Sequence, residues 1–508
     1  MDLKFETLTG MRLIAKPEYK QNYEWDIIVP DSKPDILKII TAEGFITLTS
    51  KDVMQDRAVL NGNIRINLIY LAADENNSVK NIECVQPFNY VMEIKGLKPG
   101  MKLCVYNIID KISANIINSR KLNVNVYVCF MGEAYEDYSS EYIENIEDSC
   151  VKCKCENATG LKLVDCIDKS FTVSDDYEIP SGKSSAEALL SIKPDFTHCD
   201  IKNANGKFVI RGNVCIASVY NSVSENDGIQ YMINETPVNE IVECDSVSED
   251  NILDGDVKVS NFNYILKENS DGEKRIIKYS CDVNINGKVY DTMSITPVVD
   301  AYGTTKDLKV QKESCLLDKY EKVDRGQFAA KDILYVDKNK EIQRVICTDV
   351  EAFTDKITKE SSGLKLNGHI LVDLLYQSID GELCYIRREM QFDHFIDTLI
   401  DNYPVYDVQV NADSCSYNIL SSDSIEMRVN ICYKVIARNK LGFDFVNKLE
   451  AAEKNKICHN GITVVFCDGE EVLWDIAKKY KTTVEEIMTV NGLENENDII
   501  KGMKLLIP

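Results

Sequence analysis

The sequence predicts a predominantly β chain: three repeated β-sandwich or barrel-like domains with short helices, followed by a small α+β domain. Apolar residues mostly alternate with polar ones, as in Leu122, Val124, Val126 and Val128, which is the period of a strand with one buried face. A segment with a glycine eight residues before a tyrosine also recurs three times, at domain-sized spacing. The chain is therefore expected to repeat one β domain.

Charge and composition exclude several classes of function. The 508 residues include 82 acidic and 58 basic side chains, for a net charge of −24. Such a surface repels phosphates, so neither nucleic acid nor an anionic membrane surface is an expected partner. No run of 18 apolar residues occurs and the N-terminus lacks a signal peptide, so we expect no direct membrane insertion and a cytosolic chain. Most of the 18 cysteines stand singly in apolar runs, as expected for reduced thiols.

The three copies share landmarks on both sides of the glycine-to-tyrosine segment. The segments are Gly62 to Tyr70, Gly212 to Tyr220 and Gly368 to Tyr376. A proline lies 32 residues before the glycine and another 17 after the tyrosine in the first two copies, and the third has Gln391-Phe392-Asp393 at the second of these places. We interpret the glycines as bulges or close strand approaches and the tyrosines as core or strand-edge residues rather than a binding site.

Domain boundaries follow from these landmarks. We expect the three β domains at residues 10–135, 164–298 and 306–440. An acidic, cysteine-containing linker is predicted at 136–163 and a polar linker at 441–460. A short helix is predicted after the early proline of the first two copies, at 34–40 and 184–192, from apolar residues at helical spacing.

The last 48 residues, 461–508, have a different pattern. A strand at 462–466 precedes a helix whose apolar stripe ends at Tyr480. Thr483 and Glu486 form a capping box for a second helix, Gly492 ends it, and a final strand closes the chain. The order strand, helix, helix, strand predicts a two-stranded sheet under two helices.

This tail resembles a LysM domain in Gly469, Leu473 to Tyr480, Thr483, Ile487, Asn491 and the terminal Gly-x-x-Leu-x-Ile-Pro. One extra residue stands between Gly469 and Leu473, in the first of the two loops that form the glycan groove of LysM modules. The departure argues against sugar binding.

The whole chain resembles the SipL family of clostridial spore-coat morphogenetic proteins, which carry SPOCS domains. The residues Asp31 to Ile36, the glycine-to-tyrosine strand and Asn118 to Val124 carry this resemblance. It implies a non-catalytic scaffold in the mother-cell cytoplasm, at the forespore surface and spore coat, that binds the coat-basement ATPase SpoIVA through its LysM domain; other coat proteins are possible partners. The alternative is a LysM domain that reads N-acetyl glycans of peptidoglycan or cortex, which would require export.

The candidate partner-binding residues lie in the tail. Trp474 stands about 100° around the helix from Leu473, beside the apolar stripe, so we expect it to be partly exposed. It would either anchor a partner or cap the small core. Ile462 and Lys478 would extend the same patch. Asp468, Gly469 and Asn491 complete the candidate set.

No catalytic constellation, and therefore no enzyme or cofactor, is expected. Ser181 to Ser184 resembles the end of a P-loop, but Tyr177 replaces the leading glycine, so we interpret it as a turn. The four histidines are scattered, and Glu485 and Glu486 suit a helix N-terminus. Metal is not expected; the weak candidate is Cys150, Cys153 and Cys155, which could hold zinc, form a redox pair or be solvent thiols.

Overall fold

A computed structural model describes residues 1–204, 207–224, 227–243, 248–397, 405–452, 463–468, 472–496 and 498–508. Within these ranges the chain is almost entirely β-strand, which confirms the predicted fold class. The two helices, α1 (Leu473–Tyr480) and α2 (Val484–Asn491), both lie in the C-terminal module, residues 463–508.

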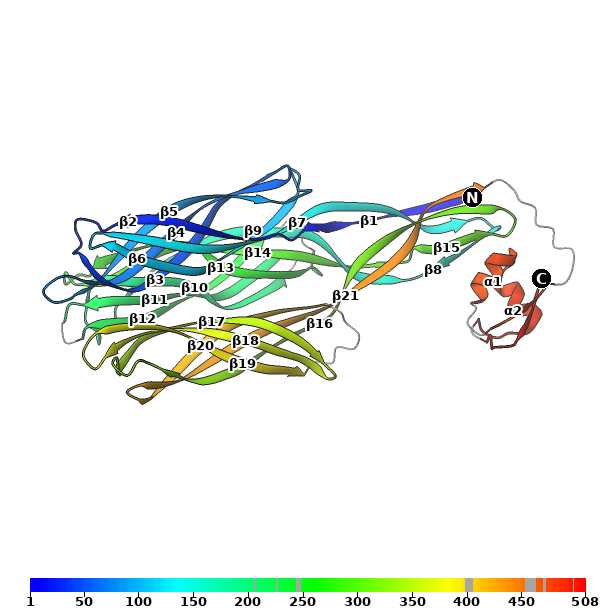
Figure 1. Cartoon of the computed structure of the whole chain (residues 1–508). Helices are drawn as coiled ribbons and strands as arrows, with labels where there is room; N and C mark the ends of the chain where they lie inside the picture. Colours follow the sequence, from blue (N-terminus) through cyan, green and yellow to red (C-terminus); the bar gives the residue numbers. More distant parts are fainter. Residues whose placement is uncertain are drawn as a thin grey trace.

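The first copy is a sandwich of two antiparallel layers (Figure 1). One layer is the three-stranded sheet of β3 (Ile36–Met54), β4 (Arg57–Ala72) and β5 (Val79–Glu93). The other consists of β2 (Glu18–Ile28), β7 (Lys121–Glu147) and β6 (Lys102–Asn118), which belong to a ten-stranded sheet that continues into the other two copies. Alternate residues of β4 and β7, such as Leu60, Ile64, Leu122 and Val124, are fully buried in one core. Burial of this alternating face drives the two sheets together.

The second and third copies repeat this architecture. In the second, β10 (Ala186–Ala204), β11 (Lys207–Ser222) and β12 (Ile229–Glu243) pack on β9 (Ala158–Glu178), β14 (Lys274–Ile295) and β13 (Ile252–Glu268). In the third, β17 (Ile342–Glu360), β18 (Gly363–Ser378) and β19 (Leu383–Asp397) pack on β16 (Asp307–Tyr335), β21 (Ser424–Ala452) and β20 (Val405–Ser421). Each copy therefore has its own core.

Strand register is the same in the three copies. The residue that follows the repeat glycine pairs with Pro87 in the first copy, Pro237 in the second and Gln391 in the third. The sequence alignment of the copies is therefore confirmed. Tyr70, Tyr220 and Tyr376 are at most 1% exposed, which confirms them as core residues.

The predicted short helices are wrong: residues 36–40 begin β3 and residues 186–192 begin β10. Both strands carry β-bulges here, between Ile36 and Lys38 and between Ile39 and Thr41 in β3. Each bulge adds one residue and shifts the alternation, so Ile36, Ile39 and Ala42 contact the core at a spacing of three. This spacing resembles that of a helix face.

The predicted linkers are also strands. The first, 136–163, contains the end of β7, the whole of β8 (Val151–Cys155) and the start of β9. The end of β7 pairs with β1 (Asp2–Ala15). Residues 441–452 of the second belong to β21 and pair with β16, whereas 453–460 lie outside the described residues. With β15 (Val298–Gly303), which pairs with β8, these strand ends project from the three copies as a stalk (Figure 1). The stalk is stabilised by its own buried side chains, Tyr142, Ile143, Phe445 and Val446 among them.

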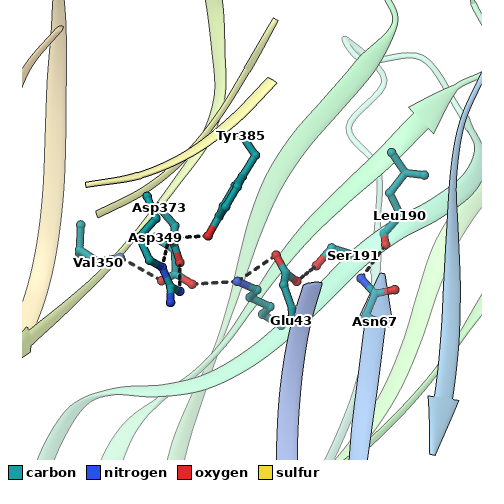
Figure 2. Close-up of polar contacts among 10 residues, drawn as sticks. Glu43, Asn67, Leu190, Ser191, Asp349, Val350, Asp373 and Tyr385 are labelled. Carbon is teal, nitrogen blue, oxygen red and sulfur yellow. Dashed lines mark hydrogen bonds and ion pairs between the residues drawn. The ribbon is translucent and has the colours of Figure 1, made fainter. Parts of the chain in front are cut away.

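The three copies meet at one junction. Lys193 of the second copy lies 3.2 Å from Glu43 of the first and 2.8 Å from Asp349 of the third. Ser191 donates a 2.8 Å hydrogen bond to Glu43 as well (Figure 2). Burial opposes ionisation of Lys193, but the two carboxylates outweigh it and raise its pKa. Beside these polar groups lies an apolar cluster drawn from all three copies: Ile69, Leu190, Val219, Ile346, Leu375 and Leu383.

Candidate functional site

The C-terminal module has the predicted strand, helix, helix, strand order. Its strands β22 (Thr463–Phe466) and β23 (Lys504–Ile507) pair antiparallel. The capping box is present: the Glu486 amide donates to the Thr483 hydroxyl at 3.1 Å, and the Thr483 amide donates to the Glu486 carboxylate at 3.2 Å. Gly492, at φ 66°, ends α2 in the left-handed conformation.

Asn491, a predicted partner-binding residue, connects α2 to β23. Its side-chain amide donates to the carbonyl oxygens of Ile487 and Leu506, both at 2.7 Å. Its side-chain oxygen accepts the Leu506 amide, also at 2.7 Å. Both ends of this side chain therefore hold the module together, which is a structural role.

Trp474 and Lys478 converge on a single carboxylate outside the module. Trp474 is partly buried, and its Nε1 donates to Asp300 of β15 at 2.8 Å. Lys478 lies one helical turn on, and its Nζ is 2.7 Å from each Asp300 oxygen. Burial of Asp300 opposes its ionisation, yet hydrogen bonds from Lys478 and Trp474 hold its pKa below the ordinary range.

Tyr302 fixes the same face of the module to the stalk. Its ring packs edge-on against Trp474, with centroids 5.0 Å apart, and contacts the buried residues of the module. Its hydroxyl donates to the Thr482 carbonyl oxygen at 2.9 Å. Lys481 pairs with Asp307 at the edge of this contact. The face that the sequence assigned to a partner is thus engaged by β15.

Asp300 and Tyr302 were missed by the reasoning from sequence. The segment 298–303 alternates in the way a strand does, which places an acid and an aromatic residue on one side. That signal indicates a two-residue contact surface. It does not indicate which of the chain's many surfaces lies opposite, because Trp474 is 174 residues away.

The remaining candidate residues of the module lie elsewhere. Ile462 and Gly469 are outside the described residues, and Asp468 is exposed in the loop that follows β22. A second surface was not foreseen: Val464 and Phe466 of β22 and Leu506 of β23 are 42%, 66% and 41% exposed on the sheet face away from the helices. Val464 pairs with Leu506, so the three form one apolar patch.

The P-loop-like segment is a turn, as predicted. The Lys183 amide donates to the Pro180 carbonyl oxygen at 2.9 Å, and its Nζ donates to the Tyr231 carbonyl oxygen. Lys33 of the first copy makes the equivalent contact with Asn81. The ammonium group of Lys183 therefore fastens a loop to β12.

The cysteine-rich segment lies at the stalk. Cys150 precedes β8, and Cys153 and Cys155 lie two residues apart on that strand, with Cys155 exposed. Across the described ranges, no group of three or more His, Cys, Asp or Glu side chains is arranged to hold a metal ion. Neither α1 nor α2 is long and apolar enough to span a membrane, and no other helix occurs in the part that the structure describes.

Comparison with known proteins identifies two regions. The family model for the SipL SPOCS domain matches residues 35–117, which run through β3, β4 and β5 and most of β6. The LysM family model matches residues 470–508, the C-terminal module. Searches of the curated proteins and of the solved structures each gave no significant match.

Proposed function

Since the chain carries a SPOCS domain of the SipL family and a C-terminal LysM domain, we propose that this sporulation-related protein is a non-catalytic scaffold of spore-coat assembly and encasement. In this proposal it acts in the mother-cell cytoplasm at the forespore surface, and its LysM domain captures the coat-basement ATPase SpoIVA. The observation that carries the proposal is the architecture. Three packed β copies and a stalk form a body, and one small module docks against the end of the stalk away from the copies (Figure 1).

The chemistry of the captured group follows from Asp300. Trp474 and Lys478 together hold a carboxylate that is only 13% exposed, with an aromatic ring alongside. A partner that presents an acidic side chain next to an aromatic one would bind this face in the same way. It would compete with Asp300 and Tyr302, and the LysM domain would leave the stalk when it binds.

The proposal is tested by capture of SpoIVA with the full chain. We expect Trp474→Ala to reduce capture at least tenfold, because aromatic anchors contribute roughly 2 kcal/mol or more to interfaces. Val490→Ser is the matched control, since Val490 is 49% exposed on α2 of the same domain and makes no contact in this face. Undiminished capture by a folded Trp474→Ala protein would move the interface elsewhere, with the patch of Val464, Phe466 and Leu506 as the next surface to mutate.

The second candidate function is binding of N-acetyl glycans in peptidoglycan or cortex. The LysM match favours it, because LysM is a glycan-binding domain. The extra residue between Gly469 and Leu473 argues against it. Sedimentation of the full chain with purified peptidoglycan separates the two functions: retention that Trp474→Ala leaves unchanged, together with no capture of SpoIVA, would favour the glycan.

A further inference from the structure

Two thiols meet where the first copy contacts the second. Cys104 belongs to β6 and Cys166 to β9, and their side chains pack together in an apolar cluster. The flanking residues Lys102 and Asp165 form a 3.1 Å ion pair across the same boundary. Met11 of β1 pairs with Leu163 of β9 nearby, so β1 and β9 are held side by side. Cys104 and Cys166 also line the same pocket.

We propose that Cys104 and Cys166 form a reversible disulfide that locks the first copy onto the second. The two thiols lose two protons and two electrons as the S–S bond forms. The oxidant is a small-molecule disulfide, which is reduced to two thiols by exchange. The modification joins segments 62 residues apart in the sequence.

Access decides the order of the exchange. Cys104 is 2% exposed, whereas Cys166 is partly exposed and lines a pocket of about 520 Å³. The Cys166 thiolate attacks the small disulfide and releases its first thiol. The Cys104 thiolate then attacks Cys166 and releases the second. Three lysines, Lys51, Lys102 and Lys169, and two aspartates, Asp165 and Asp168, line the pocket, so a net positive charge of one favours anionic disulfides.

In the reduced pair, interaction with Cys166 lowers the pKa of Cys104 despite its burial, whereas interaction with Cys104 and burial raise the pKa of Cys166. Cys166 therefore attacks as the minor thiolate. Once Cys166 is in the mixed disulfide, Lys51 and Lys288 still favour the Cys104 thiolate, which supports its resolving role.

A second close pair provides the control. Cys153 and Cys155 lie on the same face of β8, two residues apart on one strand. Residues at that spacing on one strand have Cα atoms about 6.6 Å apart and side chains side by side, near the limit for a disulfide. We expect this pair to form mixed disulfides with the oxidant rather than an internal bond.

The test is oxidation of the native full-length chain with oxidised glutathione, followed by alkylation and peptide mapping by mass spectrometry. We expect a peptide that links Cys104 to Cys166, two hydrogen atoms lighter than the reduced pair, and a rise of roughly 5 °C in the unfolding midpoint of the oxidised chain. Cys104→Ser should instead trap glutathione on Cys166, and Cys166→Ser should leave Cys104 unmodified. Cys155→Ser should leave the link intact.

Two results would overturn the proposal. One is a native chain that forms no Cys104–Cys166 link while Cys155 is modified in the same sample, because the oxidant then reached the protein without closing the bond. The other is a folded Cys104→Ser variant with no adduct on Cys166. Cys104→Ala, checked by circular dichroism, covers the case in which serine does not fold at this buried position.

Discussion

Gly62, Gly212 and Gly368 each lie against a phenylalanine ring, where no larger residue fits. A Cβ atom at Gly62 would lie 2.2 Å from the Thr47 carbonyl oxygen and 2.6 Å from the Phe88 ring. A Cβ atom at Gly368 would lie 2.1 Å from the Phe353 carbonyl oxygen and 2.4 Å from the Phe392 ring. The predicted close strand approach is thus confirmed, and the ring fills the space that the missing side chain leaves.

Gly62→Ala should lower the free energy of unfolding by about 1–3 kcal/mol, because the added methyl group displaces the Phe88 ring or separates β4 from β3. Urea unfolding of the full chain measures it. Gly182→Ala is the control, since a Cβ there meets nothing within 4 Å. Equal losses from both substitutions would contradict the packing argument.

Glu133 is the buried acid between the first two copies. It pairs with Lys288 of the second copy at 2.9 Å and with Lys16 at 3.0 Å, and it is 8% exposed. Burial opposes ionisation, but these lysines outweigh it and lower the pKa of Glu133 to about 2. A carboxyl whose folded-state pKa is depressed stabilises the fold above its unfolded pKa, and this contribution is lost as the pH falls through the folded value.

We therefore expect Glu133→Gln to flatten the loss of stability between about pH 4.5 and pH 2, and to cost roughly 2 kcal/mol at pH 7. Unfolding curves at several pH values measure both effects. The control is Glu243→Gln, because Glu243 pairs with Lys207 at an exposed site. If the free energy of unfolding of Glu133→Gln falls with decreasing pH as steeply as that of the native chain, other carboxyl groups determine the acid sensitivity.

The contact between α1 and β15 attaches the LysM domain to the stalk. Asp300 receives hydrogen bonds from two residues of α1, and Tyr302 packs into the core of the LysM domain. The Trp474 ring is shared between the domain and the stalk, which leaves it partly exposed in the way its helix position predicts.

Asp300→Ala should weaken this docking by about 1–3 kcal/mol, because Lys478 and the Trp474 N–H lose their buried acceptor. Fluorescence in a Trp25→Phe background reports Trp474 alone, and we expect a red shift together with increased capture of SpoIVA. Lys152→Ala removes only the 3.9 Å pair with Glu485 and should change neither signal. A red shift without increased capture would separate docking from partner binding.

The strand pairing in the stalk indicates where the C-terminus of the chain can be truncated without loss of stability. β16 and β21 remain paired as far as Asp307 and Ala452, and Phe445 and Val446 are fully buried. A fragment of residues 1–452 should therefore unfold like the full chain. A fragment of residues 1–440 should lose at least about 3 kcal/mol, since it exposes the partners of those side chains. Calorimetry of both fragments tests this, and equal stability would refute a stalk with its own core.

Lys193 couples the copies at the scale of the whole molecule. Its ammonium group pairs with Glu43 and Asp349 of the other two copies, although its side chain keeps 40% of its surface exposed. The apolar cluster beside it buries Ile69, Leu190 and Leu375, one from each copy. Three cores joined in this way should unfold together.

Lys193→Met should remove about 1–2 kcal/mol of coupling, because Glu43 and Asp349 are left facing each other. Differential scanning calorimetry should then show a broader or divided transition. Lys202→Met is the control, since Lys202 pairs with Asp200 on its own strand. If both variants melt in one sharp transition, the apolar cluster alone couples the copies.

Alternation of apolar residues determined that the chain is β, the recurring glycine-to-tyrosine segment showed that one domain repeats three times, and helical spacing predicted the strand, helix, helix, strand module. Each of these is a pattern that can be read along the chain. The capping box at Thr483 and the turn at Lys183 were equally readable. Tertiary structure decided the rest. Bulges in β3 and β10 gave strands the spacing of a helix, and the strands taken for linkers find partners as distant as Asp2 and Glu147. Trp474 meets Asp300 across 174 residues, and no local period records which surfaces will face each other when separate elements pack.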